Sequence, residues 1–287
     1  MKFLFVRGNR SEFPVGKMCQ VLKVSRSGFY DWNSREKGQR QMENEMLKEK
    51  IKEIFNKSRA LYGSPRVHAE LKAQGYSCSE NRVARLMRGK FVAKTVKMFR
   101  RTTNSDHKYR PAPDLIHQNF VAPAPNSIWT SDITYIRTLE GWLYLAVVLD
   151  VYSRKVVGWS MSERLTKELV ITAVSNAIIR RKIAGDVIFH SDQGVQYACD
   201  VFRSFLKRNK IKQSMSRKGI CYDNAITESF FHTLKTEHVY FNQYITRRDA
   251  RQSIFDYIEV FYNRERRHSS IGYLSPDQFE RRAITVR

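Results

Sequence analysis

Three acidic residues in the second half of the chain lie at positions that suggest a chemical role. Asp132 lies inside the segment Trp129–Tyr135, which is otherwise rich in strand-forming residues, and strands disfavour aspartate. Asp192 directly follows the apolar run Val187–His190, at the kind of strand end where open α/β sheets bind ligands. Glu228 lies about one turn into a predicted helix, which Asp223 and Asn224 are expected to cap. These types and positions point to metal or acid–base chemistry.

Taken singly, each carboxylate has an ordinary explanation. Asp132 suits a solvent-facing strand position, Asp192 a turn, and Glu228 the positive end of a helix. Taken together, two neighbouring strands and a covering helix bring three carboxylates around one point, where they repel each other unless a cation lies among them. Magnesium suits such a site because it prefers oxygen ligands and keeps waters for substrate phosphates. The sequence therefore predicts Mg²⁺ ligands at these three positions.

The elements that must position these carboxylates follow from hydrophobic periodicity. Alternation and short apolar runs predict strands, with Glu140-Gly141 as a hairpin turn, whereas 3.6-residue periodicity predicts helices. The expected strands are 128–137, 142–151, 154–162, 186–190 and 211–216, and the expected helices are 166–181, 201–210, 224–238 and 247–265. Three antiparallel strands followed by alternating helices and strands predict an α/β fold with a mixed sheet covered on both faces.

The N-terminal third is predicted to be helical. Residues 12–35 suggest a short helical pair, and further helices are expected around 46–55, 64–71 and 79–88. Arg82, Arg85 and Arg88 lie along one side of the last of these, where they would read DNA or simply form a solvated face. Residues 94–126, with Pro111, Pro113, Pro123 and Pro125, resemble a basic linker.

The charge balance favours a polyanionic partner. The chain carries 51 Lys and Arg against 28 Asp and Glu, a net charge of +23. Residues 1–110 hold 26 of the basic and 10 of the acidic residues, a net of +16. Composition alone fits a nucleic-acid-coating protein as well as a DNA enzyme. The 4 cysteines form no C-x-x-C pair, and neither a signal peptide nor a long apolar run is present, so a cytoplasmic protein without zinc or membrane contact is expected.

Several segments together resemble the insertion-sequence transposases of the IS-three family, in particular the OrfB product. In that family the acidic residues form a DDE motif, and 35 residues lie between Asp192 and Glu228 here, as in that family and in retroviral integrases. Lys235, seven residues beyond Glu228, occupies the place of the family's basic residue. The resemblance covers about residues 40–282 and is carried by Trp129–Tyr135, His190–Tyr197, Asp223–Phe231, the tail Tyr262–Pro276 and the upstream Tyr62–Arg66.

The resemblance implies a ribonuclease H-like integrase core with a mixed five-stranded sheet, preceded by small all-helical DNA-binding modules. It also implies two Mg²⁺ ions, replaceable by Mn²⁺, that are bridged by Asp132 and held on either side by Asp192 and Glu228. Water would then nick the ends of the element and a DNA 3′-hydroxyl would attack target DNA, while Lys235 contacts a phosphate. Further implied partners are the terminal inverted repeats, target DNA, other copies of the chain and an upstream-frame product.

The expected domain order begins with a partial helix-turn-helix-like segment and ends with a helical extension. The divisions are 1–40, a helical DNA-binding module over 41–93, the linker 94–126, the catalytic core 127–240 and the C-terminal extension 241–287. Two alternatives remain open, a catalytically silent DNA-binding regulator and a metal-dependent nuclease of the same fold. Asp150 is either a fourth carboxylate at the site or a partner of Arg154 in the following turn.

Overall fold

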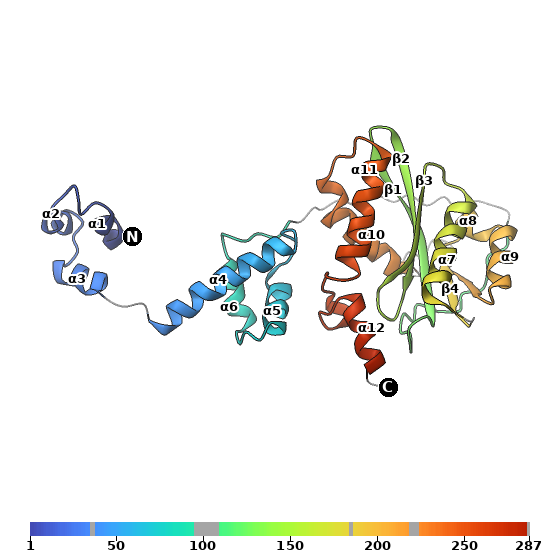
Figure 1. Ribbon diagram of the computed structural model, residues 1–287, viewed down its shortest axis with the longest axis horizontal. Helices are drawn as coiled ribbons and strands as arrows, with labels where there is room; N and C mark the ends of the chain where they lie inside the picture. Colours follow the sequence, from blue (N-terminus) through green and yellow to red (C-terminus); the bar gives the residue numbers. More distant parts are fainter. Residues whose placement is uncertain (35–37, 95–108, 184–185, 218–223, 286–287) are drawn as a thin grey trace.

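The computed structural model describes residues 1–34, 38–94, 109–183, 186–217 and 224–285, and Figure 1 shows them as two helical modules followed by a sheet with helices on both faces. The first module contains α1 (Lys2–Gly8), α2 (Val15–Val21) and α3 (Arg26–Ser34). Only the last two were predicted. The additional helix forms because Val6 is fully buried beside Phe29, and Lys2 Nζ donates a hydrogen bond of 2.8 Å to the carbonyl of Leu22.

A second set of three helices, the helical module, contains α4 (Gln39–Lys57), α5 (Ser64–Ala73) and α6 (Glu80–Met87). Ser79 caps α6, since its Oγ accepts the backbone N–H of Arg82 at 3.3 Å. Pro65 lies in the first turn of α5, but the N-cap of that helix is Gly63 and not Ser64 as the sequence suggested, and no side chain caps it. The apolar side chains of the three helices meet in one core, which includes Leu47, Ile51, Ile54, Val67, Leu71 and Val83.

The sheet has five strands in the order β3-β2-β1-β4-β5. Their bounds are β1 Ile128–Thr138, β2 Gly141–Asp150, β3 Val156–Ser162, β4 Ile188–Ser191 and β5 Lys212–Met215. The first three strands are antiparallel neighbours, whereas β4 and β5 run parallel to β1. This arrangement confirms the predicted ribonuclease H-like mixed sheet.

Helices cover both faces of the sheet (Figure 1). One face packs against α7 (Lys167–Arg181), α8 (Val195–Ala198) and α9 (Asp200–Arg208), and the other against α10 (Ala225–Glu237) and α11 (Arg247–Phe255). The predicted helix over 247–265 changes to wider π-helical turns at Asp256–Tyr262. Short 3-10 turns at Val239–Phe241 and Ser269–Ile271 and the unpredicted α12 (Pro276–Thr285) complete the tail. Within the described ranges, no helix has the length and apolarity needed to cross a membrane.

The second half of the predicted linker lies along the core. Of the expected linker 94–126, residues 95–108 lie outside the described ranges. The backbone N–H of Leu115 donates to Ser214 Oγ at 2.9 Å, and that of Met215 donates to the carbonyl of Pro113 at 3.3 Å. Ile116 is buried in a small cluster with Ile128. Residues 109–126 therefore bind the edge strand β5, because their backbone groups find partners there.

Asp150 organises the far end of β2, but not through the side chain of Arg154. Its carboxylate accepts the backbone N–H groups of Asn126 at 2.7 Å and Tyr152 at 2.9 Å. Arg181 donates to it at 3.2 Å and also pairs with Glu280 of α12 at 2.8 Å. Burial raises the pKa of Asp150 to about 6 even though the Asn126 N–H and Arg181 oppose the rise. Asp150 thus joins β2, α7 and α12.

Gly158 sets how closely α7 approaches the sheet. A Cβ atom at this position of β3 would lie 2.3 Å from the carbonyl oxygen of Ala173 and 2.7 Å from the Cβ of Ala177. We expect Gly158→Ala to lower the free energy of unfolding by about 3 kcal/mol or more, because α7 must move away from the strand. Urea unfolding followed by circular dichroism measures this change.

The matched control is Gly16→Ala in α2, where a Cβ atom meets nothing within 4 Å. An alanine at this exposed helical position should leave stability unchanged or raise it by about 0.5–1 kcal/mol. Equal unfolding midpoints for Gly158→Ala and the wild type would show that the close approach of α7 and β3 is wrong.

Candidate active site

The register of β1 and β4 places two of the three predicted carboxylates side by side. These strands are parallel neighbours, and Ser131 is paired with Ser191 at the end of β4. Asp132 follows Ser131 on β1, and Asp192 follows Ser191 at the end of β4. The spacing between neighbouring strands therefore brings the backbones of the two aspartates to about 5 Å from each other. Asp192 was predicted as a site residue because it follows a strand, and the same position places it beside Asp132.

Asp132 is half-buried and lies in a negative environment. Its Oδ1 accepts the backbone N–H of Ile133 at 2.7 Å. Burial raises the pKa of Asp132 well above its usual range, and the charges of Asp192 and Glu228 raise it further. The hydrogen bond from Ile133 and the charge of Lys235 act in the opposite direction. The structure thus brings all three predicted acids, and the predicted lysine, within electrostatic reach of one point.

A tight turn fixes the carboxylate of Asp192. Its Oδ1 accepts the backbone N–H of Gly194 at 3.0 Å, and Gln193 Nε2 donates to the carbonyl of Ser216 at 2.9 Å. A Cβ atom at Gly194 would lie 3.0 Å from the same Oδ1. A larger residue at Gly194 would therefore press on the carboxylate of Asp192; the backbone itself is not left-handed, since its φ is −57°.

Glu228 occupies the exposed side of the first turn of α10. The opposite side of this helix is anchored by Phe230, Phe231 and Leu234, which are buried in the core beneath the sheet. Asn224 was expected to cap the helix, but its side chain makes no capping bond; its Nδ2 donates to the carbonyl of Ser131 at 3.2 Å. This bond joins the start of α10 to β1 next to Asp132. The other expected cap, Asp223, lies outside the described residues.

Lys235 is seated on an aromatic ring that the sequence did not indicate. Its Nζ lies 5.1 Å from the ring centroid of Tyr135 on β1. Tyr135 in turn packs edge-on against Trp142 of β2, with centroids 4.9 Å apart. Burial lowers the pKa of Lys235, and the charge of Asp132 partly opposes this effect. The contact depends on how α10 packs against β1, so the spacing of residues in the sequence does not place Tyr135 beside Lys235.

The three arginines of α6 have different surroundings. Arg82 donates to Glu43 Oε2 at 3.0 Å and to Asn44 Oδ1 at 2.9 Å, so it joins α6 to α4. Arg85 and Arg88 are exposed. The spacing predicted three arginines along one exposed side of this helix, but only Arg85 and Arg88 are exposed there.

The three carboxylates fit a hard divalent cation in chemistry and charge. They supply oxygen ligands, and both burial and their mutual repulsion disfavour the charged form of Asp132 when no cation is bound. As placed, no three carboxylate, imidazole or thiol groups among the described residues lie close enough together to hold one ion. The acids are neighbours without forming a closed cage, which suits a cation that shares its remaining positions with water and substrate.

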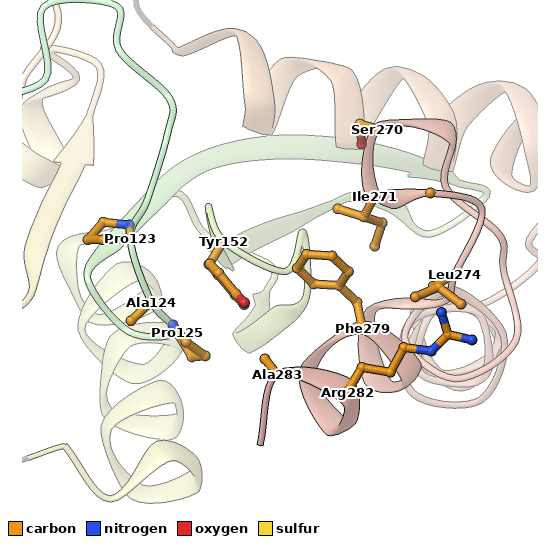
Figure 2. Close-up of a pocket in the computed structure, with 11 residues that line it drawn as sticks. Pro123, Ala124, Pro125, Tyr152, Ser270, Ile271, Leu274, Phe279, Arg282 and Ala283 are labelled. Atoms are coloured by element: carbon orange, nitrogen blue, oxygen red, sulfur yellow. The ribbon is translucent and has the colours of Figure 1, made fainter. Parts of the chain in front are cut away.

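A separate groove of about 910 Å³ lies elsewhere on the molecule (Figure 2). Its walls are the prolines Pro123 and Pro125, the ring of Tyr152 and apolar side chains of the tail, including Phe279, whose ring centroid is 5.2 Å from that of Tyr152. None of the three carboxylates lines this groove.

Comparison with protein families divides the chain in agreement with the structure. An integrase core domain family matches residues 122–221, and a second family of the same description matches residues 228–284. An HTH-like domain family matches residues 42–89, which correspond to the helical module.

Close relatives extend over the whole chain. The transposase InsF for insertion sequence IS3A of Escherichia coli (strain K12) is 44% identical over 287 residues, covering 99% of this chain and 100% of the relative. An uncharacterized 31 kDa protein of insertion element IS600 from Shigella sonnei is also 44% identical, over 91% of this chain and 97% of its own.

Solved structures similar to this chain include retroviral integrases. A simian T-cell lymphotropic virus intasome in complex with PP2A regulatory subunit B56 gamma shares 16% identity over 74% of this chain and 69% of the other, with a TM-score of 0.48. The HTLV-2 integrase catalytic core domain in complex with magnesium shares 18% identity over 55% of this chain and 98% of the other, with a TM-score of 0.42.

We expect Asp132→Asn to stabilise the metal-free protein. The folded-state pKa of Asp132 is raised, so its charged form opposes folding at pH 7, and this cost grows as the pH rises above the unfolded-state pKa. Replacing the charge by a neutral amide should raise the free energy of unfolding at pH 7 by about 1–2 kcal/mol, the scale typical of relieving one unfavourable site.

Urea unfolding in EDTA measures this gain, and repetition with MnCl₂ tests its cause. Divalent cation should stabilise the wild type by mass action and the variant much less. Equal stabilisation of both proteins by Mn²⁺ would contradict the role of Asp132 as a ligand.

Proposed function

The chain belongs to the IS3 family of insertion-sequence transposases, and we propose that it nicks the ends of its element and joins the freed 3′-ends to target DNA with Asp132, Asp192 and Glu228. The observation that carries this proposal is the adjacency of Asp132 and Asp192 beyond the paired serines of β1 and β4, with the charge of Glu228 acting on the same point. Two adjacent carboxylates with a third acid within electrostatic reach are the kind of donor set that phosphodiester chemistry with divalent cations uses.

Each residue has a distinct task in this proposal. Asp132 would contribute to both metal positions, while Asp192 and Glu228 would each complete one. Bound there, Mg²⁺ or Mn²⁺ supplies activation of the attacking hydroxyl and stabilisation of the leaving 3′-oxygen. The turn at Gly194 orients the carboxylate of Asp192, and the bond from Asn224 to Ser131 orients the helix that carries Glu228.

Lys235 and the exposed arginines are the proposed DNA contacts. Lys235 is held beside Asp132 by the ring of Tyr135, so its ammonium group would face a phosphate close to the reacting one. Arg85 and Arg88 are exposed on α6 and would bind the terminal inverted repeat; Arg82 would position α6 through its bonds to α4.

The assembly follows from the reaction. Two ends and a target must be joined together, which calls for several copies of the chain on DNA, with the upstream-frame product as a fusion or partner for end recognition. We place this assembly on DNA in the bacterial cytoplasm.

The decisive measurement is nicking and strand transfer on an oligonucleotide that carries the end sequence flanking the gene. We expect Glu228→Gln to reduce both reactions about 10²–10³-fold in Mg²⁺ or Mn²⁺, because an amide cannot replace a charged ligand. The matched control is Glu168→Gln, since Glu168 is likewise an exposed glutamate in the first turn of a helix that covers the sheet. It should retain wild-type activity.

The other outcomes identify the alternatives. If the wild type binds the end but neither nicks nor joins it, the chain is a silent regulator or needs the upstream-frame product. A chain fused to the upstream-frame product distinguishes these two cases, because only the second then becomes active. Nicking without joining, when a free 3′-end and target DNA are supplied, indicates a nuclease of the same fold. Equal loss of activity in both glutamine variants would contradict the specific role of Glu228.

A further inference from the structure

The helical module is fastened to the catalytic core by buried polar contacts. The phenol oxygen of Tyr62 accepts the backbone N–H of Arg267 at 2.8 Å and donates to the carbonyl of Glu265 at 3.1 Å. Glu70 pairs with Arg267 at 2.6 Å. The two segments that carry these contacts are the upstream and tail motifs noted in the sequence, and neither belongs to the carboxylate site.

Glu237 is the point where the module, the tail and the catalytic helix meet. Arg266 binds its carboxylate through two parallel hydrogen bonds of 2.6 and 2.7 Å, and Arg66 of α5 binds it at 3.2 Å. Tyr257 donates to it at 3.2 Å. Burial opposes ionisation of Glu237, but the hydrogen bonds and charges of Arg266 and Arg66 outweigh it and lower its pKa. The charged carboxylate is thus held from two domains at once.

Glu237 is also the last residue of α10, the helix that carries Glu228 and Lys235. The apolar core is continuous across the same junction: Leu47 and Val67 of the module belong to one buried cluster with Phe230 of α10 and Tyr257. Polar contacts of fixed geometry and a shared core leave the module little freedom to move relative to the carboxylates.

The six residues Tyr62, Arg66, Glu70, Glu237, Arg266 and Arg267 are here named the interdomain latch. We infer that the latch makes the helical module a rigid arm that sets which phosphate is nicked relative to the DNA sequence bound by the module, an inference that rests on the proposed function. Arg66, Glu237 and Tyr62 are positioning residues in this scheme. The opposite arrangement is a tethered module that brings DNA near and leaves the choice of phosphate to the core.

Spacing of the DNA distinguishes a rigid arm from a tether. An insertion of one or two base pairs is placed between the sequence that the module protects from cleavage reagents and the terminal phosphate. With a rigid arm, the wild-type nick moves with the insertion or is lost. A nick that stays at the original terminal sequence at an undiminished rate would overturn the inference, while leaving the proposed function intact.

Loosening the latch should blur the position of the nick. The variant Tyr62→Phe/Arg66→Gln keeps the ring of Tyr62 in the core but removes its two hydrogen bonds and the Arg66–Glu237 pair. Since each lost bond weakens docking several-fold, we expect the share of nicks at neighbouring phosphates to rise roughly tenfold or more. Total nicking should change much less. A wild-type pattern in this variant would overturn the inference.

Lys50→Gln is the matched control because it removes the same charge from the same module. Lys50 pairs with Glu53 on its own helix at 2.8 Å. The Lys50→Gln variant should nick DNA at the same phosphate as the wild type. If the share of nicks at neighbouring phosphates rose as much in Lys50→Gln as in the double variant, the effect would come from the lost charge and not from weaker docking.

Hydrogen exchange tests the rigid arm without any nicking. In the wild-type full chain, amides of α4–α6 should become exchangeable together with those of the sheet as denaturant is added, whereas in the double variant they should open first. Early independent opening of α4–α6 in the wild type overturns the inference. Absence of nicking by the wild type counts against the proposed function alone, and the exchange experiment then decides on the arm.

Discussion

Parallel pairing of β1 with β4 is the constraint on which the rest of the molecule depends. It places Asp132 and Asp192 at neighbouring positions beyond Ser131 and Ser191, where two negative charges repel across little more than one strand spacing. Such a pair opposes folding until a cation arrives, so the strands must be held in register by other forces. The buried clusters on the two faces of the sheet supply these forces, and the close packing of α7 on Gly158 belongs to them.

Helix α10 combines three tasks along one short element. Its first turn presents Glu228 to the other acids, its last turn carries Lys235 on the ring of Tyr135, and its final residue, Glu237, is bound from two domains. The apolar side between them is buried, so none of these groups can move without the others. The proposed chemistry, the proposed contact with DNA and the docking of the module therefore share a single element.

Hydrophobic periodicity was enough to predict the strands and most helices, because strong local patterns carry that information. The three acids were singled out by their places on predicted strands and a helix and by the family resemblance, and their role stays a prediction. The sequence did not reveal features that depend on distant pairing. For Asp150 the sequence left open a place at the acidic site or a pairing with Arg154, four residues away, yet its ion-pair partner is Arg181 of α7. Arg82 was predicted to face outward but binds Glu43 of α4. The seat of Lys235 on Tyr135 depends on the fold in the same way.

The latch also bears on how such chains diversify. Tyr62, Arg66 and Glu70 bind partners 203, 171 and 197 residues further along the chain, whereas Arg85 of α6 and Arg88 at its C-cap are exposed. If α6 recognises the element end as proposed, substitutions on its exposed side would alter recognition and leave the contacts of Tyr62, Arg66 and Glu70 unchanged. Recombination that exchanges the whole helical module, however, separates Arg66 from Glu237 of α10 and Glu70 from Arg267 of the tail. New end specificity is thus more accessible by point mutation on α6 than by shuffling of entire domains.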